Sequence, residues 1–381
     1  MEGNIHKTNV LIVGGGPAGA SAALSLLNYS ELQVVIVEQS NFNQERTGEH
    51  VSASIFDLID YLKIDKEEFE QESFMPTHSN TTYWGSDFPS TNHSIFSTDG
   101  STFQLNRDQF DIKLIEQVAE RGGTVLPRSK CVDFQYLENK SWLIKIKHAE
   151  KGEFNIQADY LIDATGRAAH VCRKIGVPSK KHDSLMAVGT FLSFDTEPNS
   201  KREQILEATE LGWWYTAQLP NNKMVITLFT DADIISENKL HQANDWNYLL
   251  SSTKKVKYLV NGATALSEKP WVRNAQTQIT DPTGIDHFIA IGDAASSFDP
   301  ISSMGIGFSI TSAFHAAKHI QSELSQNKVL TTNSFQKDIE QNFERYLKIR
   351  KHYYQQEKRW ASSSFWKRRN SIENQTVPNP N

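Results

Sequence analysis

The sequence is poor in cysteine and has no long apolar run. Its 381 residues include two cysteines, Cys131 and Cys172, and neither belongs to a CxxC pair. Two cysteines cannot form a disulfide framework, which fits a reducing compartment. The largely apolar Val10–Leu27 is interrupted by glycines and Pro17, unlike a signal peptide. No other stretch reaches the roughly 18 apolar residues of a membrane span, so we expect a cytoplasmic protein.

A strong excess of charge is also absent. The 39 Lys and Arg residues and 45 Asp and Glu residues give a net charge of −6, so nothing indicates a nucleic-acid-binding surface. The content of 38% hydrophobic and 22% charged residues indicates a folded globular chain, whose length fits two or three domains. Only the tail from Ser371 has the composition of a disordered segment.

A glycine-rich turn lies near the N-terminus. The run "NVLIVGGGPAGASAALSLL" predicts a buried strand, a turn and a helix, and Gly14, Gly16 and Gly19 fit G-x-G-x-x-G. In this motif the first glycine makes the turn, the second admits a pyrophosphate, and the third lets helix and strand pack closely. Glu38 ends the next predicted strand, where a carboxylate accepts ribose hydroxyls. A dinucleotide without a 2′-phosphate, NAD or FAD, is therefore expected.

Two later segments favour FAD. "QADYLIDATGRAAH" (157–170) predicts another strand beside the dinucleotide sheet, and "HFIAIGDAA" (287–295) predicts a strand that ends at Asp293. An Asp there can accept hydrogen bonds from a ribityl chain, which NAD lacks. A helix beginning near Gly305 would direct its free N–H groups at the edge of the flavin that becomes negative on reduction.

Together these motifs resemble the FAD-dependent p-hydroxybenzoate hydroxylase superfamily. GGGPAG with Glu38, the ATGR run and GDAA…DP…G carry the resemblance. It implies an α/β fold with a Rossmann-like FAD-binding domain, a second mixed β-sheet substrate domain and a C-terminal helical extension. The implied FAD-binding residues are Gly14, Gly16, Ala18, Gly19, Glu38, Gln39, Arg46, Arg107, Asp293, Pro300, Gly305 and Ile306. For Arg46 and Arg107 the alternative is a solvated surface charge.

The expected domains are discontinuous. Residues 1–75, 100–176 and 275–330 are assigned to the FAD-binding domain, 76–99 and 177–274 to the substrate domain, 331–370 to C-terminal helices and 371–381 to a disordered tail. "MAVGTFLSF", "GWWYTAQLP" and "KMVITLFT" predict strands in the substrate domain. There Trp213, Trp214 and Tyr215 either line a substrate pocket or pack within the sheet.

The C-terminal segment combines cations with aromatic residues. Between Arg345 and Arg369 it contains Tyr346, Tyr353, Tyr354, Trp360, Phe365 and Trp366. Such a mixture can form a protein-docking face. The favoured interpretation is an amphipathic helix that buries its aromatic residues and exposes its cations.

Further segments resemble one branch of the superfamily. "RTGEHVSAS", "YWGSD", "GDAASSFDPISSMGIG" and "HYYQQEKRWASSSFWKRR" resemble the branch of flavin-dependent halogenases, geranylgeranyl reductases and LodB/GoxB-like flavoproteins, which mature quinone-cofactor amino-acid oxidases. Halogenation is disfavoured because no lysine occurs between Lys66 and Lys113, where halogenases place one. Tyr215 and Ala217 also replace the tryptophans of the halogenase W-x-W-x-I-P motif.

The resemblance and the chemistry of indole suggest a function. A reduced flavin reacts with O₂ and can hydroxylate an electron-rich ring in a dry site. The hypothesis is an FAD-dependent monooxygenase that hydroxylates a tryptophan of a precursor quinoprotein oxidase during tryptophylquinone biogenesis. The candidate catalytic residues are Glu49, His50 and Tyr215. The electron donor is NAD(P)H or a separate reductase.

Two other functions stay open, and no metal is expected. The chain can be a small-molecule flavin enzyme, either an aromatic hydroxylase or a prenyl reductase. It can also be a flavoprotein chaperone without oxygen chemistry. His315 and His319 lie one helical turn apart but lack an evident third ligand, so we interpret their spacing as coincidental.

Overall fold

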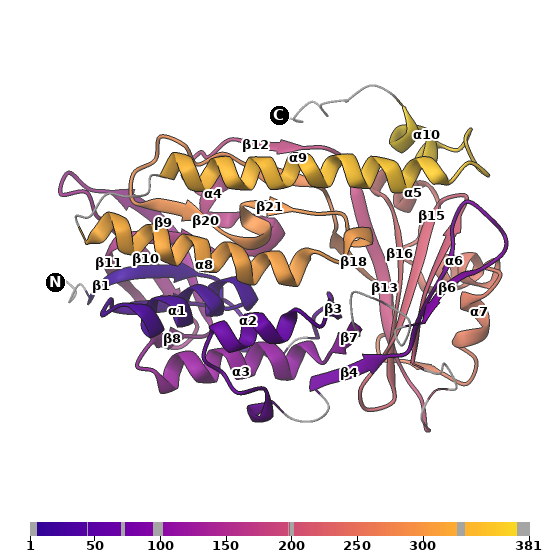
Figure 1. The fold of residues 1–381 in the computed structure, drawn as a ribbon, viewed down its shortest axis with the longest axis horizontal. Helices are drawn as coiled ribbons and strands as arrows, with labels where there is room; N and C mark the ends of the chain where they lie inside the picture. The colour runs from indigo at the N-terminus through magenta and orange to yellow at the C-terminus, as the bar shows by residue number, and fades with distance from the viewer. Residues whose placement is uncertain are drawn as a thin grey trace.

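The computed structural model describes residues 6–43, 45–69, 73–93, 102–196, 198, 202–325 and 332–371. Two large sheets lie at opposite ends of the long axis, and a long C-terminal helix runs across both (Figure 1). The tail from residue 372, for which the sequence predicts disorder, lies outside the described residues.

The first sheet is built around a strand whose second half is buried. Its order is β8 (Thr124–Leu126), β2 (Val34–Val37), β1 (His6–Val13), β11 (Gly152–Asp163), β10 (Trp142–His148) and β9 (Ser129–Tyr136), with β20 (Phe288–Ala290) also paired to β11. Neighbouring strands pair in parallel among β8, β2, β1, β11 and β20. The pairs β11–β10 and β10–β9 are antiparallel. Val10 to Val13 are buried on both faces of the sheet, as the apolar run of a central parallel strand predicts.

Helices cover this sheet and begin at its strand ends. α1 (Pro17–Tyr29) follows β1 and contacts both α3 (Arg107–Glu120) and α8 (Gly305–Leu324). Pro17 begins α1, where its missing N–H costs nothing. Shorter helical segments are α2 (Ile55–Tyr61), η1 (Lys66–Glu68), η4 (Gly166–Ala168), α4 (His170–Lys174), η5 (Gly292–Ala294) and η6 (Pro300–Ser302).

The second large sheet is mixed. Its order is β17 (Thr264–Ala265), β13 (Leu185–Ser193), β16 (Lys223–Asp231), β15 (Gly212–Leu219), β14 (Glu203–Thr209), β5 (Ser79–Tyr83) and β6 (Ser90–His93), with β18 (Trp271–Asn274) paired to β13. β14 and β5 are parallel and the other pairs are antiparallel. The three strands predicted from the sequence are β13, β15 and β16. The sequence did not predict helices here, but the structure has α5 (Ala232–Glu237), α6 (Ala243–Ser251) and α7 (Val256–Leu259).

Two small sheets lie beside the large ones. One consists of β3 (His50–Ser52), β7 (Thr102–Leu105) and β4 (Phe74–Thr77), and the other of β12 (Ser179–Lys181), β19 (Gln278–Thr280) and β21 (Ser296–Ser297). The structure confirms the predicted α/β fold with a Rossmann-like part, a second mixed sheet and C-terminal helices. The exact domain boundaries remain a proposal.

The C-terminal helices α9 (Thr332–Gln356) and α10 (Ser364–Asn370) pack against the rest of the molecule (Figure 1). Tyr346, Tyr354, Phe365 and Trp366 are buried, as the favoured interpretation predicts, but Tyr353 is exposed, so the prediction is wrong for that residue. The prediction that the cations are exposed is wrong for two arginines. Arg350 pairs with Asp183 at 2.6 Å and Arg369 with Asp231 at 2.7 Å, and both are largely buried, because carboxylates of the second sheet region face these helices.

The described residues contain no candidate for a membrane-spanning helix. No helix in the described part of the chain combines the length and the apolar character that crossing a membrane requires.

Candidate functional site

A cavity of about 780 Å³ lies between the two large sheets. One wall comes from the glycine turn after β1, the loop 45–50 and the segment 298–306. The opposite wall comes from β13, β15, β16 and β18. Most predicted site residues line it: Gly16, Ala18, Gln39, Arg46, Glu49, His50, Arg107, Tyr215, Asp293, Pro300, Gly305 and Ile306. Gly14, Gly19 and Glu38 are not among its lining residues.

The three motif glycines have different surroundings. Gly14 has φ +112°, and a Cβ there would lie 2.3 Å from the carbonyl oxygen of Ala164. A Cβ on Gly19 would lie 1.9 Å from the carbonyl oxygen of Gly14. A Cβ on Gly16 would meet only Arg46 Nη1, at 3.7 Å, so this position faces open space. Gly14 and Gly19 thus allow close packing, while Gly16 leaves room for a ligand against the backbone.

Glu38 holds the glycine turn. Its Oε2 accepts a hydrogen bond from the Gly15 N–H at 2.7 Å, and its Oε1 accepts one from the Ser40 N–H at 2.8 Å. Each carboxylate oxygen can accept more than one hydrogen bond. Binding of ribose hydroxyls by Glu38 therefore stays a prediction, and the adjacent Gln39 lines the cavity.

Arg46 and Arg107 converge on one buried carboxylate. Arg107 donates two hydrogen bonds to Asp111, from Nε at 3.0 Å and from Nη2 at 2.9 Å, and Arg46 Nη1 lies 3.0 Å from the same group. Arg107 Nη1 also donates to the carbonyl oxygen of Thr47 at 2.6 Å. Arg107 is buried, so a solvated surface charge is not its role. The cluster fixes the loop 45–50 against α3.

Asp293 has an unpaired oxygen at the cavity wall. Its Oδ2 lies 3.4 Å from Arg167 Nε, whereas its buried Oδ1 has no hydrogen-bond partner in the part of the chain that the structure describes. Nearby, Asp299 is fully buried and accepts a hydrogen bond from the Ile301 N–H at 3.1 Å, which shapes the turn that contains Pro300. Since a buried acceptor without a donor is costly, Asp293 Oδ1 indicates a ligand hydroxyl.

The predicted helix start at Gly305 is confirmed. α8 begins there and runs to Leu324, with its N-terminal residues Gly305 and Ile306 at the cavity. The N–H groups of a first helical turn lack intrahelical partners and carry partial positive charge. A Cβ on Gly305 or Gly307 would meet no atom within 4 Å. The helix end therefore has room beside it for a flat, partly anionic ring.

These features fit FAD. The turn at Gly16 admits a pyrophosphate, Asp293 offers an acceptor to a polyol chain, and the α8 terminus offers N–H donors to an isoalloxazine edge. All three lie on the same wall of one cavity. FAD bound there would have the strands of the second sheet opposite its ring.

The opposite wall is aromatic. Trp213, Tyr215, Phe229 and Trp271 line the cavity, and Trp213 stacks on Phe229 with ring centroids 4.1 Å apart. Trp214 points to the other face of the sheet and packs against Trp246 (centroids 5.3 Å apart). Because successive side chains of a strand point to opposite faces, Trp213 and Tyr215 line the cavity while Trp214 packs within the other face of the sheet.

Arg273 is a site residue that the sequence analysis missed. It lies over the Trp271 ring at 4.6 Å, donates to Thr47 Oγ1 at 3.2 Å and to the Glu45 carbonyl oxygen at 3.0 Å, and lines the cavity. It thus joins β18 of the second sheet to the loop 45–50. In a strand, Trp271 and Arg273 point to the same face because one residue separates them. Such a two-residue spacing alone does not identify a site residue in a sequence.

Glu49 and His50 come from the end of the loop 45–50 and the start of β3, and Tyr215 comes from β15. Burial raises the pKa of Glu49, against the opposing effect of nearby backbone N–H groups, Arg107 and Arg273. Burial also lowers the pKa of His50 to about 4, and neither ring nitrogen has a hydrogen-bond partner. Tyr215 Oη lies 3.5 Å from Gln104 Oε1, and burial raises its pKa. His50 is therefore neutral at pH 7.

His50 makes stability sensitive to acid. Its pKa is near 6.5 when unfolded and about 4 when folded, so the unfolded chain binds more protons between these values. The contribution to stability is complete above pH 6.5 and is lost as the pH falls toward 4. We expect His50→Gln to remove roughly 2–3 kcal/mol of this acid-induced loss. Urea unfolding of the wild type and of His50→Gln at pH 7 and pH 4.5 measures this difference. An equal loss of stability on acidification in the two proteins would contradict the expectation.

His319, one member of the histidine pair, contacts a glutamate of its own helix. His319 Nε2 lies 3.3 Å from Glu323 Oε2, and within the described residues no group of three or more His, Cys, Asp or Glu side chains could hold a metal ion.

Comparison with known proteins places the chain among flavoproteins. It matches the FAD binding domain family over residues 7–335. It is 40% identical over 368 residues to LodB of Marinomonas mediterranea, described as an FAD-dependent oxidoreductase, and the alignment covers 97% of this chain and 98% of LodB.

Solved structures share the fold. The flavin-dependent halogenase CmlS superposes with a TM-score of 0.83 at 23% identity, covering 97% of this chain and 68% of CmlS. QhpG, a peptidyl tryptophan dihydroxylase essential for tryptophylquinone cofactor biogenesis, superposes with a TM-score of 0.70 at 22% identity, covering 96% of this chain and 79% of QhpG.

Proposed function

Since this chain belongs to the FAD binding domain family and is an FAD-dependent oxidoreductase, we propose that it hydroxylates a tryptophan side chain of a partner protein during tryptophylquinone biogenesis. The partner is a precursor of a quinoprotein oxidase. The observation that carries this proposal is one cavity with the predicted FAD-binding groups on one wall and aromatic side chains on the other. The likeness to QhpG, which acts on a peptidyl tryptophan, supports it.

The protein's own contribution is a dry and oriented site. Reduced FAD together with O₂ supplies an electrophilic oxygen atom for an electron-rich ring. Trp213, Phe229 and Trp271 offer a flat apolar surface to an indole ring, and the first two are buried from bulk water. Arg273 fixes this wall to the loop 45–50. Positioning of the indole therefore depends on contacts made by both sheets.

The reaction needs an external reductant. One ring C–H becomes C–OH, the second oxygen atom of O₂ leaves as water, and two electrons with two protons balance the step. NAD(P)H or a separate reductase supplies the electrons. Two such rounds add the two oxygens that a tryptophylquinone requires.

Mass mapping tests the proposal. The FAD-loaded protein, a reductant, O₂ and the precursor partner are incubated together, and peptides of the partner are mapped by mass spectrometry. We expect one or two added oxygen atoms on a tryptophan, and none without O₂ or reductant. An unchanged partner would reject the hydroxylase and favour a chaperone. Oxygen transfer to free tryptophan or phenol but not to the partner would favour the small-molecule enzyme.

Halogenation has its own readout in the same experiment. Lys223, a cation near the large cavity, pairs with Glu45 at 2.9 Å and comes from β16 rather than from the segment where halogenases place their lysine. We expect no bromine isotope pattern on the partner when bromide is present. The added mass is expected to be oxygen only.

A further inference from the structure

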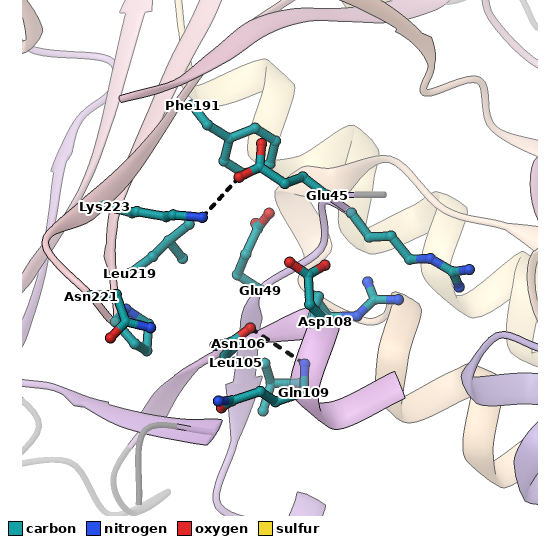
Figure 2. A pocket seen from close by; sticks show the side chains of 13 residues that line it. Glu45, Glu49, Leu105, Asn106, Asp108, Gln109, Phe191, Leu219, Asn221 and Lys223 are labelled. Carbon is teal, nitrogen blue, oxygen red and sulfur yellow. Dashed lines mark hydrogen bonds and ion pairs between the residues drawn. The ribbon is translucent and has the colours of Figure 1, made fainter. Parts of the chain in front are cut away.

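A smaller pocket of about 210 Å³ adjoins the large cavity. The two share Glu45, Arg46, Glu49 and Arg107, so they meet at the loop 45–50 and the start of α3. The small pocket is bounded on its other side by the hairpin between β15 and β16 (Figure 2). Its volume is below the roughly 300–1,000 Å³ typical of sites for whole small-molecule ligands. A pocket of this size can hold a single side chain.

Glu49 lies where the two pockets meet, and one of its carboxylate oxygens lacks a hydrogen-bond donor among the described residues. Its side chain points into the small pocket near Lys223 and Asp108 (Figure 2). It is 4% exposed, and its Oε1 is buried without a hydrogen-bond partner. A buried carboxylate oxygen without a donor is destabilising, so the unpaired Oε1 points to a donor that arrives with a ligand.

The nearby cations are already engaged. Arg107 is bound to Asp111 and Thr47, and Arg273 to Thr47 and Glu45. Lys223 pairs with Glu45. These groups add positive potential around Glu49 but make no ion pair with it among the described residues. The small pocket therefore presents an acceptor to whatever enters it.

The remaining wall of the small pocket is partly apolar and partly polar, and its polar residues are Asn106, Asp108, Gln109, Asn221 and Lys223. Phe191, Leu219 and Pro220 line it, and Phe191 and Leu219 pack in one cluster with Tyr215 and Trp271 of the large cavity. The apolar part of this wall, together with the unpaired Oε1 of Glu49, fits a flat apolar group that carries one N–H. Indole is such a group.

We propose that the Glu49 carboxylate recognises the substrate by accepting a hydrogen bond from the N–H of an indole that enters through the small pocket. This inference rests on the proposed function, because indole is the ring that is modified there. With its N–H at Glu49, the indole extends into the large cavity toward the wall of Gly305 and Asp293. The proton stays on nitrogen, and the nearby negative charge raises the electron density of the ring, which favours attack by an electrophilic oxygen.

Paired probes test this without measuring activity. N-acetyl-tryptophanamide and its indole-N-methyl analogue are titrated into the FAD-loaded full-length protein, and binding is followed by the flavin absorbance difference spectrum. We expect the N–H probe to bind at least about ten-fold more tightly, since a site built around an N–H rejects the analogue that lacks it. In Glu49→Leu the two probes bind equally, and Glu49→Gln, which keeps an acceptor oxygen, gives an intermediate ratio.

A neighbouring carboxylate provides the control. Asp108→Asn changes the charge of the same pocket without touching the proposed acceptor, so it keeps the preference for the N–H probe, whatever its effect on overall affinity. Equal binding of both probes by the wild type, binding of neither, or an undiminished preference in Glu49→Leu would each overturn the inference. A preserved preference with no oxygen transfer to any partner would reject the proposed function alone.

Discussion

Gly19→Ala is expected to destabilise the protein by about 4 kcal/mol or more and to abolish FAD binding. The new Cβ would lie 1.9 Å from the carbonyl oxygen of Gly14, and a backbone atom in this turn cannot rotate away. α1 would have to move off the end of β1, which separates the helix terminus from the pyrophosphate position. Urea unfolding of the FAD-free protein measures the first effect, and titration with FAD measures the second.

Gly305→Ala is the matched control, because the same methyl group has the opposite effect on stability. It meets no atom within 4 Å, and alanine favours a helix by up to about 1 kcal/mol over glycine. The FAD-free protein is thus expected to be equally or more stable, while FAD affinity falls because the methyl occupies the room beside α8. FAD binding as tight as in the wild type would show that the ring does not lie at this helix end.

Arg350→Ala is expected to cost about 3–5 kcal/mol of stability. Arg350 lies between Asp183, at 2.6 Å, and Asp299, at 3.3 Å, and both carboxylates are buried. Its loss leaves two buried negative charges without their cation. Because Asp299 shapes the turn that contains Pro300, FAD affinity is expected to fall as well. Thermal unfolding and FAD titration measure the two effects.

Two variants bracket this result. Tyr354→Phe removes the hydrogen bond that Tyr354 Oη donates to Asp299 at 2.7 Å, with an expected cost of about 1–3 kcal/mol. Lys145→Ala removes an ion pair with Glu153 that is half exposed, and no measurable change is expected. If Arg350→Ala were as mild as Lys145→Ala, the buried network would not stabilise the protein.

The local part of the site could be predicted from the sequence. The strand, turn and helix around Gly14 depend on residues close together in the chain, and so does the start of α8 at Gly305. In each case a short pattern fixes backbone geometry directly. Three strands of the second sheet, β13, β15 and β16, were also recognisable, because alternation of apolar residues requires no knowledge of the partner strand.

The long-range part could not be predicted. The contacts of Arg350 with Asp183 and of Arg273 with the loop 45–50 join residues far apart in the chain. A pattern of spacing cannot show which carboxylate an arginine will meet. The same limit explains the wrong prediction for Arg369, whose positive charge suggested solvent although Asp231 holds it in the interior.

The position of α9 in the chain has a consequence for synthesis. Tyr346 Oη accepts a hydrogen bond from the Asp299 N–H at 2.6 Å, and Arg350 and Tyr354 bind the Asp299 carboxylate. The ribosome makes these three residues after every strand of both sheets. A nascent chain that ends before α9 therefore has an unsupported Asp299 turn, and stable loading with flavin has to wait until that helix has emerged.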